Sequence, residues 1–420
     1  MFHSSPPQRT RSTPRNWIRL FLCVLGVLGG SANAPAQEPS APQAVSAAQL
    51  TAAIDKLGNL DYAVRTDAAR LVRRTPLAQA VPALLQAAAD HADGYVRYRA
   101  LVLLIGFNDP RTADAMRASL TSPNDRLRAV GYSFFEHHPD RAMTADLLSA
   151  LDKEQGEFVR PALVRALAAV GAGGAGGGAG GDDARVRPVL VRDVGRGADY
   201  FRSVVIEALG DYRAQYAVDA LLEVAKIDGP LQNDAALALG KIGDRRALQM
   251  LAELQRSAPQ PTQPTLAAAI CLLGINCSTH ETYLIDTLKF TDANRGFQPL
   301  LRSAAAGLAA LAVAGGHDEA VDALFSVGIG SVDPTRAPVT LALATIALRN
   351  TPLMLTVLGK HADIADRDHA VELLAEGFDM LEEDLDKETF FAVVRRTYWA
   401  SADGSPARQL MQTLIGKLDF

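Results

Sequence analysis

Apolar residues recur along most of the chain at the three- and four-residue spacing of an amphipathic helix, in short segments separated by polar turns. Residues 80–106 illustrate the pattern, with two helices joined by a polar turn. In the second helix, Ala100, Leu103 and Leu104 follow the 3.6-residue period of a buried helical face. Runs that alternate apolar and polar residues, as a half-buried strand would, are absent from the sequence. The pattern therefore predicts an all-α protein.

The two-helix pattern repeats. A hydrophobic residue followed by arginine opens the second helix of successive units, and the first four of these arginines stand 32, 31 and 32 residues apart. The next step is 42 residues, because a run of glycine and alanine at 171–181 interrupts the period, and we expect this run to be a loop insertion. The arginines are Arg65, Arg97, Arg128, Arg160 and Arg202.

A two-helix unit cannot bury its apolar face alone, so the units must stack on one another. Continuing the period to the end of the chain gives about ten units. We therefore expect an α-solenoid, a right-handed superhelix of about ten antiparallel helix pairs of the armadillo and HEAT kind.

An acidic residue precedes each marker arginine by three or four positions. A carboxylate there can cap the free N–H groups at the start of the second helix. The arginine can then reach a carboxylate in the turn of its own repeat or of the adjacent one. We expect a structural ladder that keeps the repeats in register, rather than a site for an anionic ligand. The first three acidic residues are Asp61, Asp93 and Asp125.

Segments such as DGYVRYRALVLLIGF and GEFVRPALVRALAAVG resemble HEAT repeats, in particular the short kind also found in phycobilisome lyases. The resemblance covers most of residues 48–385. It implies a scaffold that holds a protein partner on the concave side, which the second helices line. It also implies an alternative, an enzyme or lyase subunit acting on a chromophore or cofactor.

Positions on the second helices that project toward the concave side carry basic, aromatic and acidic groups. Arginine and tyrosine are favoured anchors at protein interfaces. The residues expected to contact a partner are Arg70, Arg74, Tyr98, Arg165 and Glu207.

The amino terminus has the pattern of a secretory signal peptide. Four arginines precede an apolar run at 20–30 that is too short to span a bilayer, and small residues favour cleavage between Ala36 and Gln37. We expect an exported protein, periplasmic or extracellular, with no stable membrane insertion after cleavage. The predicted segments are 1–36 signal peptide, 37–47 flexible linker, 48–170 first repeats, 171–181 glycine-rich loop, 182–387 further repeats and 388–420 helical cap.

Cleavage would leave an acidic protein. Without the four arginines of residues 1–36, the 42 basic side chains fall to 38 against 47 acidic ones, a net charge of −9. Nucleic-acid binding needs a basic surface for the phosphates, so this charge argues against it. We expect a monomer with a protein partner.

Catalytic motifs are also missing from the sequence. The glycine-rich run lacks the lysine and serine or threonine of a phosphate-binding loop, and no Gly-x-Ser-x-Gly elbow is present. His280 and Glu281 form one pair, whereas the diiron hydroxylase that resembles HEAT repeats uses several. We therefore expect no enzymatic activity, no cofactor and no metal.

Cys271 and Cys277 are the only cysteines beyond the cleavage site. An oxidising compartment permits them to form a disulfide, and two separately buried thiols are the alternative.

Overall fold

A computed structural model describes residues 42–172, 183–360, 364–381, 383–418 and 420. The chain divides into two units, Met1–Pro35 and Ala36–Phe420, and every described residue belongs to the second unit. The described residues form 22 α-helices and four short 3-10 helices and contain no strand, which confirms the all-α prediction. The predicted signal peptide, its cleavage site and residues 173–181 of the glycine-rich insertion lie outside the described residues.

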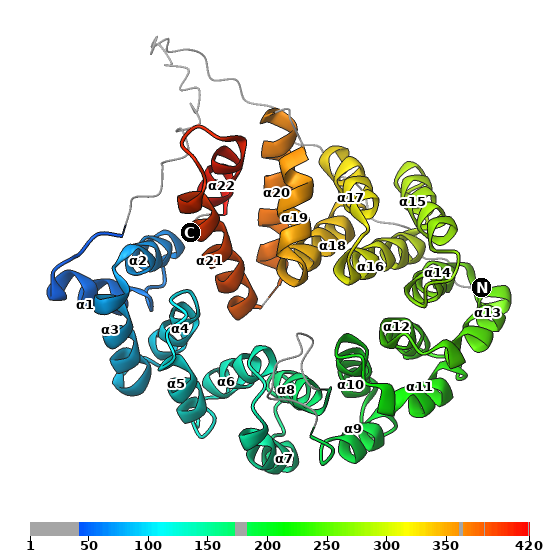
Figure 1. Ribbon diagram of the computed structural model, residues 1–420, viewed down its shortest axis with the longest axis horizontal. Helices are drawn as coiled ribbons and strands as arrows, with labels where there is room; N and C mark the ends of the chain where they lie inside the picture. The colour runs from blue at the N-terminus through cyan, green and yellow to red at the C-terminus, as the bar shows by residue number, and fades with distance from the viewer. Residues whose placement is uncertain (1–41, 173–182, 361–363, 382, 419) are drawn as a thin grey trace, which may run out of the picture. The chain divides into compact units, whose positions relative to one another are not determined.

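Within the second unit the helices alternate between an outer and an inner layer (Figure 1). The outer helices are α1 (Ala47–Lys56), α3 (Leu77–Asp90), α5 (Thr112–Ser119), α7 (Thr144–Lys153), α9 (Arg187–Val194), α11 (Val218–Ala225), α13 (Leu248–Ser257), α15 (Cys277–Ala293), α17 (Asp318–Gly330) and α19 (Thr351–Lys360). The inner helices are α2 (Tyr62–Arg74), α4 (Gly94–Ile105), α6 (Asp125–His137), α8 (Arg160–Ala172), α10 (Asp199–Asp211), α12 (Gln232–Ile242), α14 (Gln263–Leu272), α16 (Gln298–Ala314), α18 (Arg336–Arg349) and α20 (Ile364–Met380).

A last pair, α21 (Asp384–Ala400) and α22 (Pro406–Lys417), follows these ten pairs of the described chain. The 3-10 helices are Arg141–Met143, Gln215–Ala217, Arg245–Ala247 and Gln260–Thr262. Each inner helix from α4 to α18 packs on the next inner helix as well as on its own outer partner. The protein is thus an α-solenoid of HEAT-like helix pairs, as the repeat predicts.

The core consists mainly of alanine, leucine and valine, which lets neighbouring inner helices approach closely. Two glycines near the middle of the chain mark close backbone contacts between inner helices. A Cβ atom added to Gly210 of α10 would lie 2.7 Å from the Cα of Ala238 in α12. A Cβ added to Gly240 would lie 2.6 Å from the Cα of Ala269 in α14. Because backbone atoms fill this space, no side-chain rotation can make room for a methyl group.

The marker arginines and their acidic neighbours bond differently from the expected ladder. Asp61 and Asp93 do cap their helices, accepting from Ala63 N–H and Tyr95 N–H at 2.8 Å each. The side chains of Arg65, Arg97 and Arg202, however, donate to backbone carbonyls, although Arg202 also makes the expected pair with Asp199 of its own repeat at 3.1 Å. The carbonyl acceptors are Asn59 for Arg65 at 2.7 Å, Ala88 for Arg97 at 3.0 Å and Val194 for Arg202 at 3.0 Å.

For Arg97 and Arg202 the physical reason is that the last carbonyls of the outer helix have no partner within that helix, whereas Arg65 bonds to a carbonyl of the turn before its own helix. Arg128 does form the expected pair with an acidic residue of the adjacent repeat, since its Nε donates to Glu154 at 2.8 Å, and it also pairs with Asp125 at 2.7 Å. Arg160 instead lies over the ring of Phe201, 3.9 Å from its centre. Arg97 and Arg202 therefore tie their inner helices to the ends of the outer partners α3 and α9.

Among the described residues, no single helix has the length and apolar character needed to cross a membrane. Helices α18 and α19 reach the required length and apolar character only when they are taken together, and the chain bends by 117° between them.

We predict that Gly240→Ala lowers the free energy of unfolding by about 1–3 kcal/mol, because the added methyl group overpacks the contact between α12 and α14. The measurement is the midpoint of denaturant unfolding, followed by circular dichroism. The matched control is Gly229→Ala, in an exposed turn where nothing lies within 4 Å of an added Cβ atom. Equal midpoints for the two variants would contradict the close backbone approach.

Candidate functional site

The last helix pair contacts the first repeats of the same unit, since α21 packs against α4 and α6 as well as α18 (Figure 1). Three carboxylates in the first turns of α21 each pair with a cation on a different inner helix. Arg73 of α2 lies 2.7 Å from Glu388, Arg99 of α4 lies 3.1 Å from Asp384, and His137 of α6 lies 2.9 Å from Asp386. We call these three ion pairs the closure contact.

The closure contact borders a partly open cavity of about 2420 Å³ on the inner side of the stack. Its lining includes parts of α4, α6, α8, α10, α12, α16, α18 and α21. The α16 and α18 wall is largely apolar, with Ala306, Ala310, Val313 and Leu341 among its residues. Charged residues line the opposite wall and also stand near the start of α16, at Arg302, and at the end of α18, at Arg349. The cavity is therefore amphipathic.

A charged cluster occupies one side of this cavity. It comprises Glu136, His137, Arg165, Asp211, Tyr212, Lys241, Arg349, Glu383 and Asp386. Most of these residues lie on the inner helices α6, α8, α10, α12 and α18 or in the first turn of α21. Tyr212 directly follows α10, and Glu383 directly precedes α21.

Arg165 is the centre of one half of the charged cluster. Its Nε lies 2.7 Å from Glu136 Oε1 and its Nη1 lies 3.1 Å from Asp211 Oδ2. Lys241 Nζ lies 2.6 Å from the other oxygen of Asp211, and Tyr212 donates its hydroxyl to Glu136 at 2.8 Å. These bonds connect four consecutive inner helices, α6 to α12.

Arg349 of α18 connects this half to α21. Its Nη2 lies 3.1 Å from Glu383 Oε2 and 3.6 Å from Asp386 Oδ2. Its Nη1 lies 3.6 Å from Glu136 Oε1. The charged cluster and the closure contact share Asp386 and His137, so one network joins the two ends of the stack to its middle.

The environment shifts the pKa values of the acidic groups in opposite directions. Burial raises the pKa of Glu383 to about 7, with Arg349 opposing the rise and Asp386 adding to it. Burial alone would also raise the pKa of Asp386, but its hydrogen bond with His137 and the charge of Arg349 outweigh burial and hold that pKa well below its usual range. Burial lowers the pKa of His137, yet Asp386 more than offsets this and the net shift is upward.

The five residues predicted to contact a partner lie in three different places. Arg165 belongs to the charged cluster and Glu207 lines the cavity, where burial raises the pKa of its carboxyl although it stays accessible to solvent. Tyr98 was expected to face solvent and does not. Its side chain is buried, and its hydroxyl donates to Asp384 because α21 covers α4. Arg70 and Arg74 line a separate small pocket of about 280 Å³ beside α21.

Sequence reasoning missed the closure contact and most of the charged cluster. Its members lie up to 315 residues apart, so no repeat period relates them. The available signal was the spacing of Asp384, Asp386 and Glu388, three acidic residues at alternate positions at the start of the cap.

Comparison with known proteins finds no matching family model and no matching curated protein. Among solved structures, the chain is similar to an engineered protein at 17% identity, with 88% of this chain and 98% of that chain covered and a TM-score of 0.27. It is also similar to Kap95p bound to RanGDP, at 14% identity and a TM-score of 0.34, with 89% of this chain and 55% of that chain covered. A structure of importin beta gives 15% identity, a TM-score of 0.37 and coverage of 88% and 55%.

The chain thus spans little more than half the length of Kap95p and of importin beta. Similarity at this level says nothing about the partner or the activity of this protein.

We predict that Glu388→Gln loosens α21 from the first repeats. The Arg73 and Glu388 side chains are 5% and 1% exposed, and removing one partner of a buried ion pair costs about 3–5 kcal/mol because the other charge stays buried. The measurement is amide hydrogen exchange of α21 and α22. The control Glu372→Gln breaks the exposed pair with Lys417 and should change stability by at most about 1 kcal/mol. Equal exchange in the two variants would contradict a closing role for Glu388.

The pKa shifts also give the closure a pH dependence. The protonated carboxyl of Glu383 is favoured in the folded state, so its contribution to stability is present below the ordinary pKa of 4.5 and is lost as the pH rises to about 7. The contribution of His137 is complete below 6.5 and is lost as the pH rises through its raised pKa. Asp386 acts oppositely, and its contribution is lost only as the pH falls below 3.8.

We therefore predict that α21 loses exchange protection between about pH 5 and about pH 8, after correction for the intrinsic exchange rate. Protection of α11, which lies outside the charged cluster, serves as the internal control. Glu383→Gln should reduce the change, because an amide does not titrate. Protection that stays constant over this range in the unmodified protein would be incompatible with the assigned shifts.

Proposed function

We propose that the protein is an exported, non-catalytic scaffold that holds a segment of a protein partner in this cavity. The observation that carries this proposal is the cavity itself, with one apolar wall and one charged wall. Export is supported by the basic and apolar pattern of residues 1–36.

The size of the cavity favours a polypeptide segment over a small molecule. Pockets for small molecules have volumes of about 300–1,000 Å³. The cavity exceeds the upper end of this range more than twofold, at about 2420 Å³. An extended or helical segment can place apolar side chains against α16 and α18 and polar ones on the opposite side.

The charges that remain available favour a segment with acidic groups. Arg213, Arg302 and Arg396 line the cavity and are exposed, and their guanidinium groups form no hydrogen bond or ion pair with other described residues. Most carboxylates of the lining are already paired, including Asp211 and Asp386. Carboxylates of a partner are the natural counterparts of exposed guanidinium groups.

We propose no catalytic activity because the charged side chains of the cavity are already paired with one another. The Nε2 of His137 lies 2.9 Å from Asp386 Oδ1, so this ring nitrogen is already paired with a carboxylate and is not free to act as a general base. Arg165 and Arg349 each bond to carboxylates on two sides. These groups stabilise the closed stack.

One observation favours the second candidate, an enzyme of the phycobilisome lyase type acting on a chromophore or cofactor. Polar groups converge in the cavity, and the pKa values of Glu383 and Asp386 are shifted in opposite directions. Two nearby carboxyl groups with separated pKa values are a pattern of acid and base pairs in active sites.

The experiment is site-specific photocrosslinking of the full chain in its native compartment. A photoreactive residue replaces Leu341, which lines the cavity, and in a matched variant it replaces Leu77 on the outer helix α3. We predict that position 341, and not position 77, captures one acidic segment of one partner.

Removing two of the exposed arginines tests the charge argument. We expect Arg302→Gln combined with Arg396→Gln to weaken binding of the captured segment at least about tenfold, since bonds to charged groups contribute about 1.5–3 kcal/mol each. Arg256→Gln, an exposed arginine on the outer helix α13, should leave binding unchanged. Capture of no protein, together with turnover of a small molecule that Glu383→Gln abolishes, would favour the enzyme instead.

A further inference from the structure

The connection between α14 and α15 brings two sulfur atoms together. Cys271 lies in the last turn of α14 and Cys277 is the first residue of α15. Gly274 and Asn276 between them have positive φ angles of 78° and 46°, which fold the short connection back on itself. The structure joins the two cysteines in a disulfide, one of the two alternatives that the sequence leaves open.

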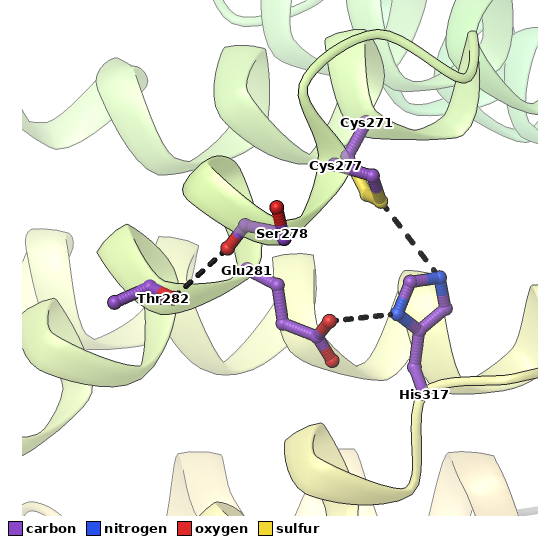
Figure 2. Close-up of a disulfide and its surroundings, with 6 residues drawn as sticks. All are labelled: Cys271, Cys277, Ser278, Glu281, Thr282 and His317. Atoms are coloured by element: carbon purple, nitrogen blue, oxygen red, sulfur yellow. Dashed lines mark hydrogen bonds and ion pairs between the residues drawn. A yellow bond between two sulfur atoms is a disulfide. The ribbon is translucent and has the colours of Figure 1, made fainter.

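A histidine from the next repeat faces this sulfur pair (Figure 2). His317 immediately precedes α17, and its Nε2 lies 4.0 Å from Cys277 Sγ. The other ring nitrogen, Nδ1, lies 3.1 Å from Glu281 Oε2. Glu281 follows Cys277 by four residues on α15, so both side chains project from the same face of the helix.

The carboxylate of Glu281, the imidazole of His317 and the sulfur atoms of Cys277 and Cys271 thus lie next to one another in this order. The side chains of Glu281 and His317 are only 15% and 17% exposed, so the pair is largely shielded from solvent. A disulfide that only joins two helices makes no use of an imidazole aimed at its sulfur, with a carboxylate 3.1 Å from its other ring nitrogen. This arrangement is the one that metal-binding histidines adopt, in which a carboxylate fixes the nitrogen that does not bind the metal.

The donor atoms also lie at suitable distances for one metal ion. One ligand atom each from Cys271, Cys277 and His317 lies within 4.8 Å of the other two. Zinc bonds of about 2.3 Å to sulfur and about 2.0 Å to nitrogen, at tetrahedral angles, place these two ligand atoms roughly 3.5 Å apart. Two thiolates and an imidazole are a soft donor set that suits Zn²⁺.

We propose that Cys271, Cys277 and His317 form a binding site for one Zn²⁺ ion when the two cysteines are reduced, with Glu281 orienting the imidazole. The disulfide and the zinc site are alternative states of the same residues. A dithiol reductant supplies two electrons and two protons, breaks the S–S bond and becomes a disulfide itself. Zinc then displaces the two thiol protons and binds neutral His317 through Nε2, with water as the fourth ligand.

The sequence predicts no metal site here, because His317 lies 40 residues after Cys277 and the three residues do not follow a known metal-binding spacing. The stacking of one repeat on the next brings the imidazole to the cysteines.

The test measures Zn²⁺ and Co²⁺ binding to the purified full chain before and after reduction with a phosphine. We predict no tight binding by the disulfide form and one equivalent bound by the reduced form. Co²⁺ should give an intense thiolate-to-cobalt charge-transfer band, a signature that carboxylate sites do not produce. Cys271→Ser combined with Cys277→Ser should abolish the band.

Variants of the other two residues separate a zinc site from a pair of reduced thiols. His317→Ala should weaken zinc binding and shift the Co²⁺ spectrum, and Glu281→Gln should weaken it about 10- to 100-fold. His280→Ala is the matched control, because His280 adjoins Glu281 in sequence but is not one of the three grouped donors. Circular dichroism checks that each variant keeps its helices.

Three results would overturn the proposal. The first is that the reduced protein binds no more zinc than the double serine variant. The second is that the disulfide form binds zinc as tightly as the reduced form. The third is that His317→Ala binds zinc as tightly as the unmodified chain.

Discussion

Three carboxylates at the start of α21 pair with cations on α2, α4 and α6, and this contact determines what the inner surface of the solenoid can hold. In a stack of repeats, each unit contacts only its neighbours, and an open stack presents a broad groove. Here residues 315 positions apart form a hydrogen-bonded ion pair, so α21 covers part of the groove and leaves a partly open cavity.

The chemistry of that contact favours one arrangement of the ends over others. Burying charged groups is costly unless each finds a partner with good geometry. Glu388 satisfies this condition, since it receives hydrogen bonds from both Nε and Nη2 of Arg73, at 3.0 and 2.7 Å to the same carboxylate oxygen. A slip of α21 by one residue would leave buried charges unpaired. Apolar packing alone tolerates such shifts more readily, because it is not directional.

Much of the fold follows from the local pattern of the sequence. The helix pairs, their approximate number and their stacking follow from a period near 32 residues, because each inner helix repeats the same buried positions. The caps at Asp61 and Asp93 are also local, and the pairing of Cys271 with Cys277 was one of two alternatives. In all these cases the interacting groups lie within one unit of the repeat or at the junction of two.

The site depends on contacts that the period does not encode. Tyr98 occupies a position that faces solvent in an isolated stack, yet α21 covers it. The sequence did identify Arg165 and Glu207 as facing the inner side. It did not indicate the partners of Arg165, which are Glu136 on α6 and Asp211 on α10. Arg349 on α18 also lies near the Glu136 carboxylate. His317 meets Cys277 only after two repeats are stacked. Contacts between residues this far apart in the sequence become visible only in the folded structure, because a single sequence carries no information on distances between repeats.

The glycines of the inner helices have an effect far from where they lie. Where Gly210 meets Ala238 and Gly240 meets Ala269, the inner helices come closer than a Cβ atom would allow, whereas the outer helices α9, α11 and α13 contact one another much less. Each such unit is a wedge that is narrower on its inner edge, and successive wedges add up to an arc. The angle of that arc decides whether α21 reaches α4, so a methyl group near the middle of the chain can separate two ends that it never touches.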